Sequence, residues 1–507
     1  MRPTDHDSSD TTSRLRRPHR FPAGLLAVAL LAALSVEAGA ETRITPRFSI
    51  DGSVTDNVLG ANEGGEEGDA FTILQPGFSI TNRGGRSRLD MSYGLSLDRY
   101  VDRTELNSEN HDLTAIGSYD VIRDQVSIDA RAGITRVVTD RTGAISATDR
   151  NPGSNQTETL TYSLSPSWVT GFSNVAVSNL TYSFGQTIFE PFGSDDDATG
   201  TATSSGGSDS TINELSYNLS SGRLFSRLGW TWSSNFVRTG QEGGSETDSA
   251  NSDATLSYTV NRFVTPRAAV GYERFRGGGD SNDFSGVTWS VGLRATPGPR
   301  TDIDLEYGRQ FDDTSIQGTA TFRVTPTINL TASATHRFSV QQAQINDGLQ
   351  NIAVDEDGNF IDATTGLPFD PNGSAVDLSE VNNVVRTKTY NLAMSGARGR
   401  NNYGVTAGLT DQSNNASGRD TMTLSSSVTY GRSLSPNAGL NLSASISSTE
   451  DSSTTDTTTY NFQAGLNYVL GSNLSGSASY SYVQRDSSTA NSDLMENVIT
   501  ARLLVTF

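Results

Sequence analysis

The chain ends in Ile499-Thr500-Ala501-Arg502-Leu503-Leu504-Val505-Thr506-Phe507. Apolar side chains occupy every second position of this stretch, and an aromatic residue closes it. Because the side chains of a β-strand alternate between its two faces, this spacing places the apolar ones together on one face. Such a strand is typical of the end of a bacterial outer-membrane β-barrel, whose outer face meets lipid. We therefore expect Leu503, Val505 and Phe507 to form the assembly signal of a barrel.

The first 40 residues have the three parts of a secretory signal peptide. Arginines at positions 14, 16, 17 and 20 precede an apolar run over residues 23–34, and Ala38-Gly39-Ala40 has the small-residue pattern of a signal-peptidase site. A membrane anchor is the alternative, but the run is shorter than the about 20 apolar residues of a spanning helix. We expect cleavage after Ala40, with Ala38 and Ala40 recognised by the peptidase.

The composition of residues 41–507 fits a membrane protein that crosses with strands. No apolar segment there is long enough for a spanning helix, and without helices only a closed barrel satisfies every backbone group in lipid. Hydrophobic residues make up 34% of the whole chain, which suffices when only alternate positions meet lipid. The chain has no cysteine, so its stability must come from other interactions. Its net charge of −20 disfavours nucleic acid as a partner.

Alternation of apolar and polar residues recurs from residue 41 to the end and predicts successive strands in one domain. It is clearest in residues 89–97, 126–134, 303–307, 328–340 and 440–446. A soluble β-protein is the alternative, with its polar face in bulk water. Many of these runs allow ten or more residues. A tilted membrane strand needs about 9–11, whereas soluble strands have about 5–6, so the lengths favour the membrane.

The connections predict the topology, because they alternate between tight and long. Turn formers mark the tight ones, and residues rich in Gly, Ser, Asp and Asn mark the long ones. We expect an all-β fold, a single transmembrane antiparallel up-and-down barrel of about 22 strands, within a range of 18–24. Short turns and both termini would be periplasmic, and long loops extracellular. Tight candidates are 83–85, 297–299, 325–326, 435–437 and 471–473; long candidates are 57–68, 139–156, 190–210, 240–250 and 342–382.

Two further sets of residues follow from the alternation. Aromatic residues should form girdles at the lipid–water boundaries. Charged residues of the polar face should line a water-filled lumen, where they either set selectivity or pair across strands to stiffen the wall. Girdle candidates are Tyr100, Tyr119, Trp168, Trp230, Trp232, Trp289, Tyr307 and Tyr482; lumen-lining candidates are Arg88, Asp90, Asp98, Asp129, Arg131, Asp304, Glu306 and Arg337.

The sequence offers little for catalysis or cofactors. Beyond residue 40 its only histidines are His111 and His336, and neither lies beside a nucleophile motif. No spacing of His or Cys suits zinc or haem. The loop acids Asp355, Asp357 and Asp362 are weak calcium candidates, since the full twelve-residue calcium loop is missing and a solvated acidic loop explains them better. We therefore expect no enzyme activity and no cofactor.

Several N-terminal motifs resemble a known barrel family. They are Arg43-Ile44-Thr45-Pro46, Thr55-Asp56-Asn57-Val58, residues 74–81 with Arg83-Gly84-Gly85-Arg86, and Tyr162-Ser163-Leu164-Ser165-Pro166. Over residues 43–170 the chain is similar to outer-membrane proteins of the β-barrel porin 2 type, in particular to barrels associated with exopolysaccharide and exosortase (PEP-CTERM) gene clusters. The resemblance implies a role in polysaccharide export and carries over no catalytic residue.

The prolines of these motifs have a consequence of their own. Each of Pro46, Pro76 and Pro166 interrupts a good strand and removes a hydrogen-bond donor from the ladder. We expect them at strand ends, rims or bulges, with bulged strands in the N-terminal part of the barrel.

Taken together, these features predict a protein of the Gram-negative outer membrane that serves exopolysaccharide export. A general diffusion porin is one alternative, and a structural or adhesive surface barrel that acts through its acidic loops is another. Expected partners are outer-membrane lipid and the barrel-assembly machinery, with polysaccharide and periplasmic export components if the first hypothesis holds. The long connection 342–382 would either constrict the lumen or stand outside as a lid.

Overall fold

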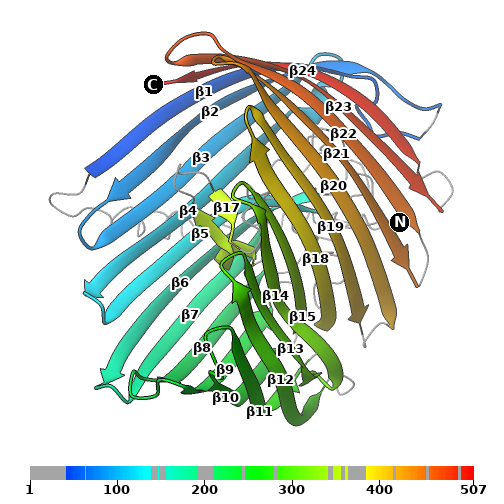
Figure 1. The fold of residues 1–507 in the computed structure, drawn as a ribbon. Helices are drawn as coiled ribbons and strands as arrows, with labels where there is room; N and C mark the ends of the chain where they lie inside the picture. The colour runs from blue at the N-terminus through cyan, green and yellow to red at the C-terminus, as the bar shows by residue number, and fades with distance from the viewer. Residues whose placement is uncertain are drawn as a thin grey trace, which may run out of the picture.

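The computed structural model describes residues 41–62, 64–138, 147, 156–190, 209–241, 246–277, 283–340, 346, 348–354, 360–363, 384–414, 418–452, 456–488 and 493–507. The expected signal peptide, with Ala38 and Ala40, lies outside these residues. Twenty-two strands form one antiparallel sheet that closes on itself, and a two-stranded sheet lies inside the ring (Figure 1). The expected fold class and strand number are confirmed.

The strands follow one another around the barrel in the order of the sequence. They are β1 (Glu41–Thr55), β2 (Asp69–Arg83), β3 (Ser87–Tyr100), β4 (Ser108–Ile122), β5 (Val126–Val138), β6 (Gln156–Phe172), β7 (Ala176–Glu190), β8 (Ser210–Ser221), β9 (Leu228–Gln241), β10 (Thr247–Tyr258), β11 (Val264–Arg276), β12 (Phe284–Gly298), β13 (Thr301–Gln310), β14 (Asp313–Thr325), β15 (Ile328–Val340), β18 (Val384–Arg398), β19 (Asn401–Asn414), β20 (Arg419–Ser435), β21 (Ala438–Asp451), β22 (Thr457–Val469), β23 (Leu474–Ser487) and β24 (Leu494–Thr506). The inner sheet consists of β16 (Ile352–Val354) and β17 (Phe360–Asp362), and Thr104–Leu106 forms a 3-10 turn.

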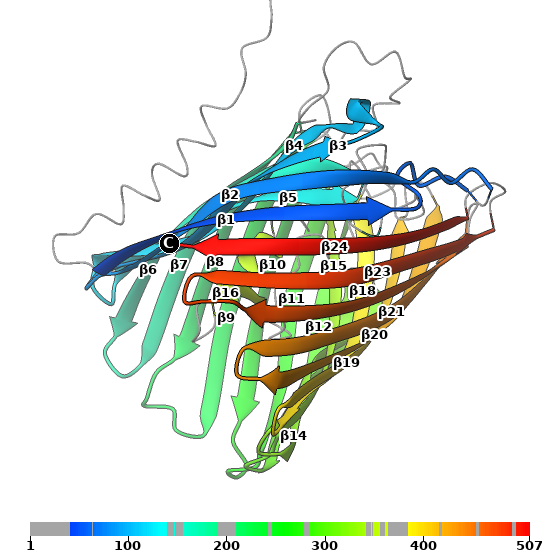
Figure 2. The ribbon, with the colours of Figure 1, turned by 90° about the horizontal axis from the view of Figure 1, so that it is seen from above.

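Closure is achieved by the first and last strands, which lie side by side (Figure 2). Residues 47–55 of β1 pair with residues 498–506 of β24. One step beyond this ladder, the backbone N–H of Phe507 donates a hydrogen bond to the carbonyl oxygen of Pro46 at 2.9 Å. The ring therefore has no free edge, which is the condition for burying strands in lipid.

The register divides the side chains of every strand between two faces. One face carries exposed large apolar side chains, such as Val270 on β11, Val287 on β12 and Ile499 on β24. We call it the lipid face, and the opposite, polar face the lumen face. An apolar outer band around a closed sheet is the arrangement of an outer-membrane β-barrel. Among the described residues, no helix is long and apolar enough to cross a membrane.

The connections show the expected asymmetry. At the end that holds both termini, short turns join β2 to β3, β4 to β5 and the later pairs in the same way. The long connections lie at the other end. The rule is not strict at the long-loop end, where connections 242–246, 415–418 and 452–456 have only four or five residues, so the predicted long connection 240–250 is wrong. The shortest is the hairpin of β13 and β14, which only Phe311 and Asp312 separate. Both residues have positive φ, as a tight two-residue hairpin turn requires.

The prediction of bulged strands at the three prolines is wrong. The ladder between β2 and β3 lapses beside Pro76 and resumes in the same register, and that between β6 and β7 does so beside Pro166. Pro46 lies just before the pairing of β1 with β24 begins. A missing N–H thus costs local hydrogen bonds, but no extra residue is inserted.

The aromatic residues predicted to form girdles are in the lipid-face phase of their strands, with one exception. Trp168, Trp232 and Tyr307 are exposed on the lipid face. Tyr100 is instead on the lumen face, where it is buried and stacks on Phe71 with ring centroids 4.9 Å apart. Its position at a strand end did not reveal the face, because the face depends on register rather than on residue type.

Removal of the terminal side chain should impair assembly. Phe507 is exposed on the lipid face directly after the last strand, so Phe507→Ser takes apolar surface from the closing strand without touching the lumen. We expect a several-fold lower yield of folded, heat-modifiable barrel in outer-membrane fractions. The matched control is Phe322→Ser, an exposed lipid-face phenylalanine of β14. Equal losses for the two variants would contradict a special role for Phe507.

Gly292 of β12 should not tolerate a side chain. A Cβ there would lie 2.6 Å from Glu306 Cγ and 2.8 Å from Arg267 Nε. We expect Gly292→Val to lower the free energy of unfolding by about 1–3 kcal/mol through overpacking, measured by urea titration in detergent. Gly286→Val on the same strand and face is the control, because nothing lies within 4 Å of a Cβ there. If Gly292→Val leaves the free energy of unfolding unchanged, Arg267 can reach Asp304 and Glu306 without the space above Gly292.

Candidate functional site: the lumen

The lumen contains a large cavity along one side of the barrel wall. Its volume is about 1030 Å³, and it follows the lumen face of β15, β18–β24 and β1. Hydroxyl and amide side chains dominate the lining, among them Asn329, Ser443, Gln463, Ser479 and Thr500. The sequence places them there because these strands alternate apolar residues with Ser, Thr, Asn, Gln and Gly rather than with charges. The cavity is therefore polar and almost uncharged.

One ion pair marks the edge of this cavity. Arg502 of β24 bonds both carboxylate oxygens of Asp51 on β1, at 2.8 Å from Nε and 2.6 Å from Nη2. The Asp51 side chain is completely buried, and Arg502 is partly exposed. This bidentate pair spans the closing seam and neutralises both charges. Neither residue was among the predicted lumen set, although both alternate with apolar neighbours in the same way.

The predicted lumen residues all lie on the lumen face, and none of them lines this cavity. Asp90 of β3 accepts hydrogen bonds from Arg83 at 2.7 Å and from Arg88 at 3.1 Å. Asp98 is fully buried near the outer end, where it accepts hydrogen bonds from Ser108 and Asn110. These acids therefore have local partners, and the wall of β3 presents little unbalanced negative charge.

A second charged group crosses three strands. Arg267 of β11 reaches over Gly292 of β12 and forms ion pairs with Asp304, at 2.5 Å, and with Glu306 on β13. The glycine leaves the space that the guanidinium occupies. Pairing across strands is thus the role that geometry gives to Asp304 and Glu306, and it stiffens this part of the wall.

The remaining predicted positions differ in their surroundings. Asp129 of β5 and Arg337 of β15 are exposed on the lumen face. Arg131 of β5 is partly buried, because a segment from the far side of the barrel lies against it. The eight residues therefore form several separate groups and do not converge on one centre.

That segment belongs to the long connection between β15 and β18. Its described residues are 346, 348–354 and 360–363, and we call them the lumen segment. Arg131 donates hydrogen bonds to the carbonyl oxygens of Leu349, at 3.2 Å, and Ile352, at 2.5 Å. Gln350 donates to Ser163 of β6 at 2.6 Å. The connection thus enters the barrel and docks on the wall of β5 and β6, opposite its own roots (Figure 1).

Two apolar side chains complete this docking. Leu349 and Ile352 are both buried, and Leu349 Cδ1 would lie 3.2 Å from a Cβ at Gly133 of β5. Of the two arrangements considered for residues 342–382, the described part supports a constriction within the lumen. The length of the connection was the only signal in the sequence. The partner wall could not be foreseen, since backbone carbonyls accept its main hydrogen bonds.

The roots of the lumen segment are held at a fork in the barrel wall. Pairing of β14 with β15 ends at Gly318 and Ala334. Beyond it, residues 313–317 stay with β13, and residues 335–340 stay with β18. Gly318 has a φ of 142°, which accommodates the parting of the strands. We call this separation the strand fork.

Aromatic packing shows how the fork is folded. Phe338 of β15 is in the lipid-face phase of its strand, but its ring lies 4.8 Å from the rings of Phe275 and Phe284, which are on the lumen face of β11 and β12. The free ends of β15 and β18 are therefore tucked inside the neighbouring strands. His336 follows the same path and is buried against Phe311 instead of facing lipid, as its phase alone suggested.

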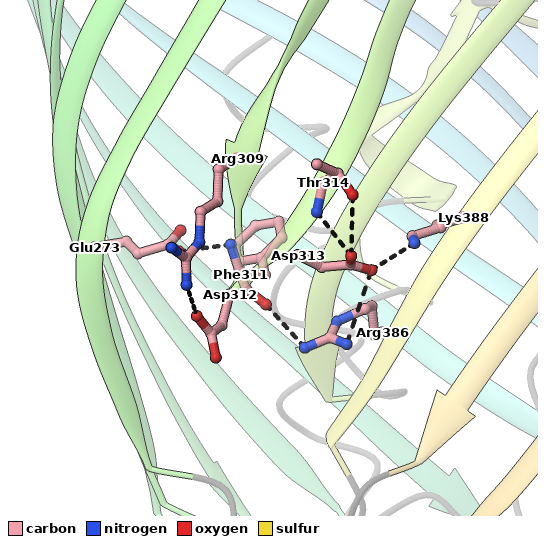
Figure 3. Close-up of polar contacts among 8 residues, drawn as sticks. All are labelled: Glu273, Arg309, Phe311, Asp312, Asp313, Thr314, Arg386 and Lys388. Carbon is pink, nitrogen blue, oxygen red and sulfur yellow. Dashed lines mark hydrogen bonds and ion pairs between the residues drawn. The ribbon is translucent and has the colours of Figure 1, made fainter.

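Charged groups close the fork (Figure 3). Asp313 of β14 lies 2.5 Å from Lys388 Nζ and 3.9 Å from Arg386 Nη1, both on β18. Arg386 also donates to the carbonyl oxygen of Phe311 at 2.8 Å, and the Phe311 N–H donates to Glu273 of β11 at 2.5 Å. We call Asp313, Arg386 and Lys388 the latch. No local pattern predicts the latch, because Asp313 is on β14 and the two cations are on β18, a strand that does not pair with β14.

The other predicted sites receive no support as catalytic or metal centres. His111 Nδ1 lies 2.9 Å from the Tyr93 hydroxyl. Asp355 and Asp357 lie outside the described residues, as does the side chain of Asp362. In the part of the chain that the structure describes, no group of three or more His, Asp or Glu residues could hold a metal ion.

Comparison with known proteins adds a likeness of fold. No family model matches the chain, and no curated protein does. Among solved structures, the FrpB iron transporter from Neisseria meningitidis (F5-1 variant) aligns with 95% of this chain and 84% of its own, at 10% identity and a TM-score of 0.49. The siderophore receptor PirA from Pseudomonas aeruginosa aligns with 92% of this chain and 80% of its own, at 11% identity and a TM-score of 0.46. The ferric-catecholate import receptor Fiu from E. coli K12, in its closed form, aligns with 90% of this chain and 81% of its own, at 9% identity and a TM-score of 0.49.

These similarities carry no argument about substrate. The resemblance of residues 43–170 to the β-barrel porin 2 type stays a prediction from the sequence, since no family model supports it.

Loss of the Arg131 side chain should free the lumen segment. Arg131→Ala removes both hydrogen bonds to the segment, and bonds from charged donors are worth about 1.5–3 kcal/mol each. We expect larger current fluctuations in single-channel recordings and faster cleavage within residues 341–383 by added protease. Arg88→Ala is the control, because it removes an exposed lumen arginine that contacts Asp90. If both variants behave alike, Arg131 does not hold the segment.

Neutralising Asp313 should loosen the fork. Asp313→Asn removes the anion between Lys388 and Arg386, so the ends of β15 and β18 lose their link to β14. We expect faster amide hydrogen exchange in residues 335–340 and 384–388, with unchanged exchange in β1 and β24. The control is Asp302→Asn, which removes an exposed ion pair with Arg294 at the turn end. Unchanged exchange in Asp313→Asn would show that aromatic packing alone closes the fork.

Proposed function

We propose that this protein is an outer-membrane conduit for an exported polysaccharide. The observation that carries the proposal is the cavity of about 1030 Å³ in the lumen, lined by side chains that both donate and accept hydrogen bonds. Sugar hydroxyls have the same capacity, so a glycan can exchange water for protein along this wall at little cost. The sequence resemblance to barrels of exopolysaccharide clusters points in the same direction.

The lumen segment gives the conduit a partly closed resting form. It occupies the side of β5 and β6, while the cavity follows β18–β24. A polymer would therefore pass between the segment and the uncharged wall. Among the described residues that line the cavity, the aromatic ones are Tyr403 and Tyr430, both in the lipid-face phase of their strands. Recognition would then depend on hydrogen bonds rather than on stacking.

A general diffusion channel is the second candidate, favoured by the same polar cavity. The two differ in what the protein does in the cell. Deletion of the gene should abolish or reduce surface polysaccharide if the conduit proposal holds, and leave it unchanged while small-solute uptake falls if the protein is a diffusion porin. Complementation with the intact gene is the control for effects on neighbouring genes.

Single-channel conductance of the purified barrel tests the channel itself. Deleting residues 342–382 leaves residues 341 and 383 between the paired Val340 and Val384, which is the length of a two-residue hairpin turn. We expect small or intermittent currents from the intact protein and steady, larger currents from the deletion variant. Silence in both forms would exclude a conduit and a porin alike, and would leave a structural or adhesive role.

A further inference from the structure

The cavity wall has an electrical property that the proposed function does not require. Among the described residues that line the cavity, the charged ones are Asp51 and Arg502, and these two are bound to each other. Between them and β15, the lining strands present Ser, Thr, Asn, Gln and Gly on the lumen face. Over the height of the cavity this wall is therefore electrically neutral. Charged side chains of the same face lie nearer the long-loop end, where Arg419 pairs with Asp451 and Glu496 accepts hydrogen bonds.

Several charged groups elsewhere in the lumen are already engaged. Arg131 is bound to carbonyl oxygens of the lumen segment, and Arg267 is bound to Asp304 and Glu306. The cations Arg386 and Lys388 hold Asp313 in the latch. None of these cations faces the cavity, so an anionic polymer would leave water without gaining a counter-charge there.

The net negative charge of the chain also disfavours an anionic polymer. Its net charge of −20 repels a polyanion before it reaches the barrel, whereas an uncharged polymer is unaffected. Passage also requires weak, repeated binding, which hydroxyl and amide groups provide without a deep electrostatic trap.

We infer that the conduit selects an electrically neutral, hydroxyl-rich polymer and discriminates against uronic-acid or otherwise anionic chains. This inference rests on the proposed function and narrows it to a substrate class. The determinant is the neutral lumen face of β18–β24, not the acidic residues elsewhere in the barrel.

Blockade of single-channel current by oligosaccharides tests it. The full-length barrel and the 342–382 deletion variant are reconstituted in planar bilayers, with neutral malto-oligosaccharides or oligogalacturonates of matched length as probes. We expect neutral probes to block the current and anionic ones to block much less often at equal concentration. A potassium chloride gradient should give a reversal potential near zero.

A charge added to the neutral wall should reverse the preference. Ser443 and Ser479 line the cavity, so Ser443→Arg or Ser479→Arg should increase the frequency of oligogalacturonate blockades several-fold. Ser165→Arg is the matched control, because it adds the same charge on the lumen face of β6, away from the cavity lining. Malto-oligosaccharide blockade reports whether each variant is still an open barrel.

The outcomes separate the two proposals. Equal blockade by neutral and anionic probes, or strong ion selectivity of the unmodified channel, would overturn the inference and leave the conduit standing. Absence of blockade by every probe, in both the intact and the deletion form, would overturn the conduit and the inference together. An equal response to Ser165→Arg and Ser443→Arg would show that the cavity wall is not the determinant.

Discussion

The structure depends on one constraint, that no backbone N–H or C=O group of a strand can remain unpaired in lipid. Residues 47–55 and 498–506 satisfy it by pairing across the seam, which makes the first and last strands neighbours. Once the ladder closes, alternation sends one set of side chains to lipid and the other to the lumen. With an even number of strands, both termini are also placed at the same end.

The lumen divides into two unlike halves because the constraint acts only on the backbone and on the lipid face. The wall of β3, β5, β11 and β13 carries ion pairs and receives the lumen segment. The cavity-lining wall of β18–β24 carries hydroxyl and amide groups, with ion pairs at the seam and at the long-loop end. Charges that would be costly in hydrocarbon are tolerated inside. Arg83, Arg267 and Arg502 are bound to carboxylates, and Arg131 is bound to carbonyl oxygens. The division gives the lumen one side that holds the chain and one side that leaves space.

Features set by alternation could be predicted from the sequence, and features set by contacts between distant strands could not. Period two along the chain predicted the fold class and the face of each predicted charge, and the alternation of tight and long connections predicted the strand number. The girdle prediction was wrong for Tyr100, which is on the lumen face, because residue type does not determine which face of a strand a side chain is on. The register beside Pro76 and Pro166 was kept because neighbouring ladders hold it. The strand fork depends on Phe338 meeting Phe275 and Phe284, which are more than fifty residues away, and no local pattern records that contact.

The latch contains the only lysine of the chain, Lys388. Its ammonium group is engaged with Asp313 and is about three-quarters covered by the surrounding fold, since its side chain is 25% exposed. Apart from the amino terminus, the protein therefore has a single primary amine, and it is located where the wall divides. A reagent that modifies primary amines would have one internal target, the Lys388 ammonium group, and this group becomes more accessible when the neighbouring strands separate. The molecule thus carries a natural reporter group at its most irregular point.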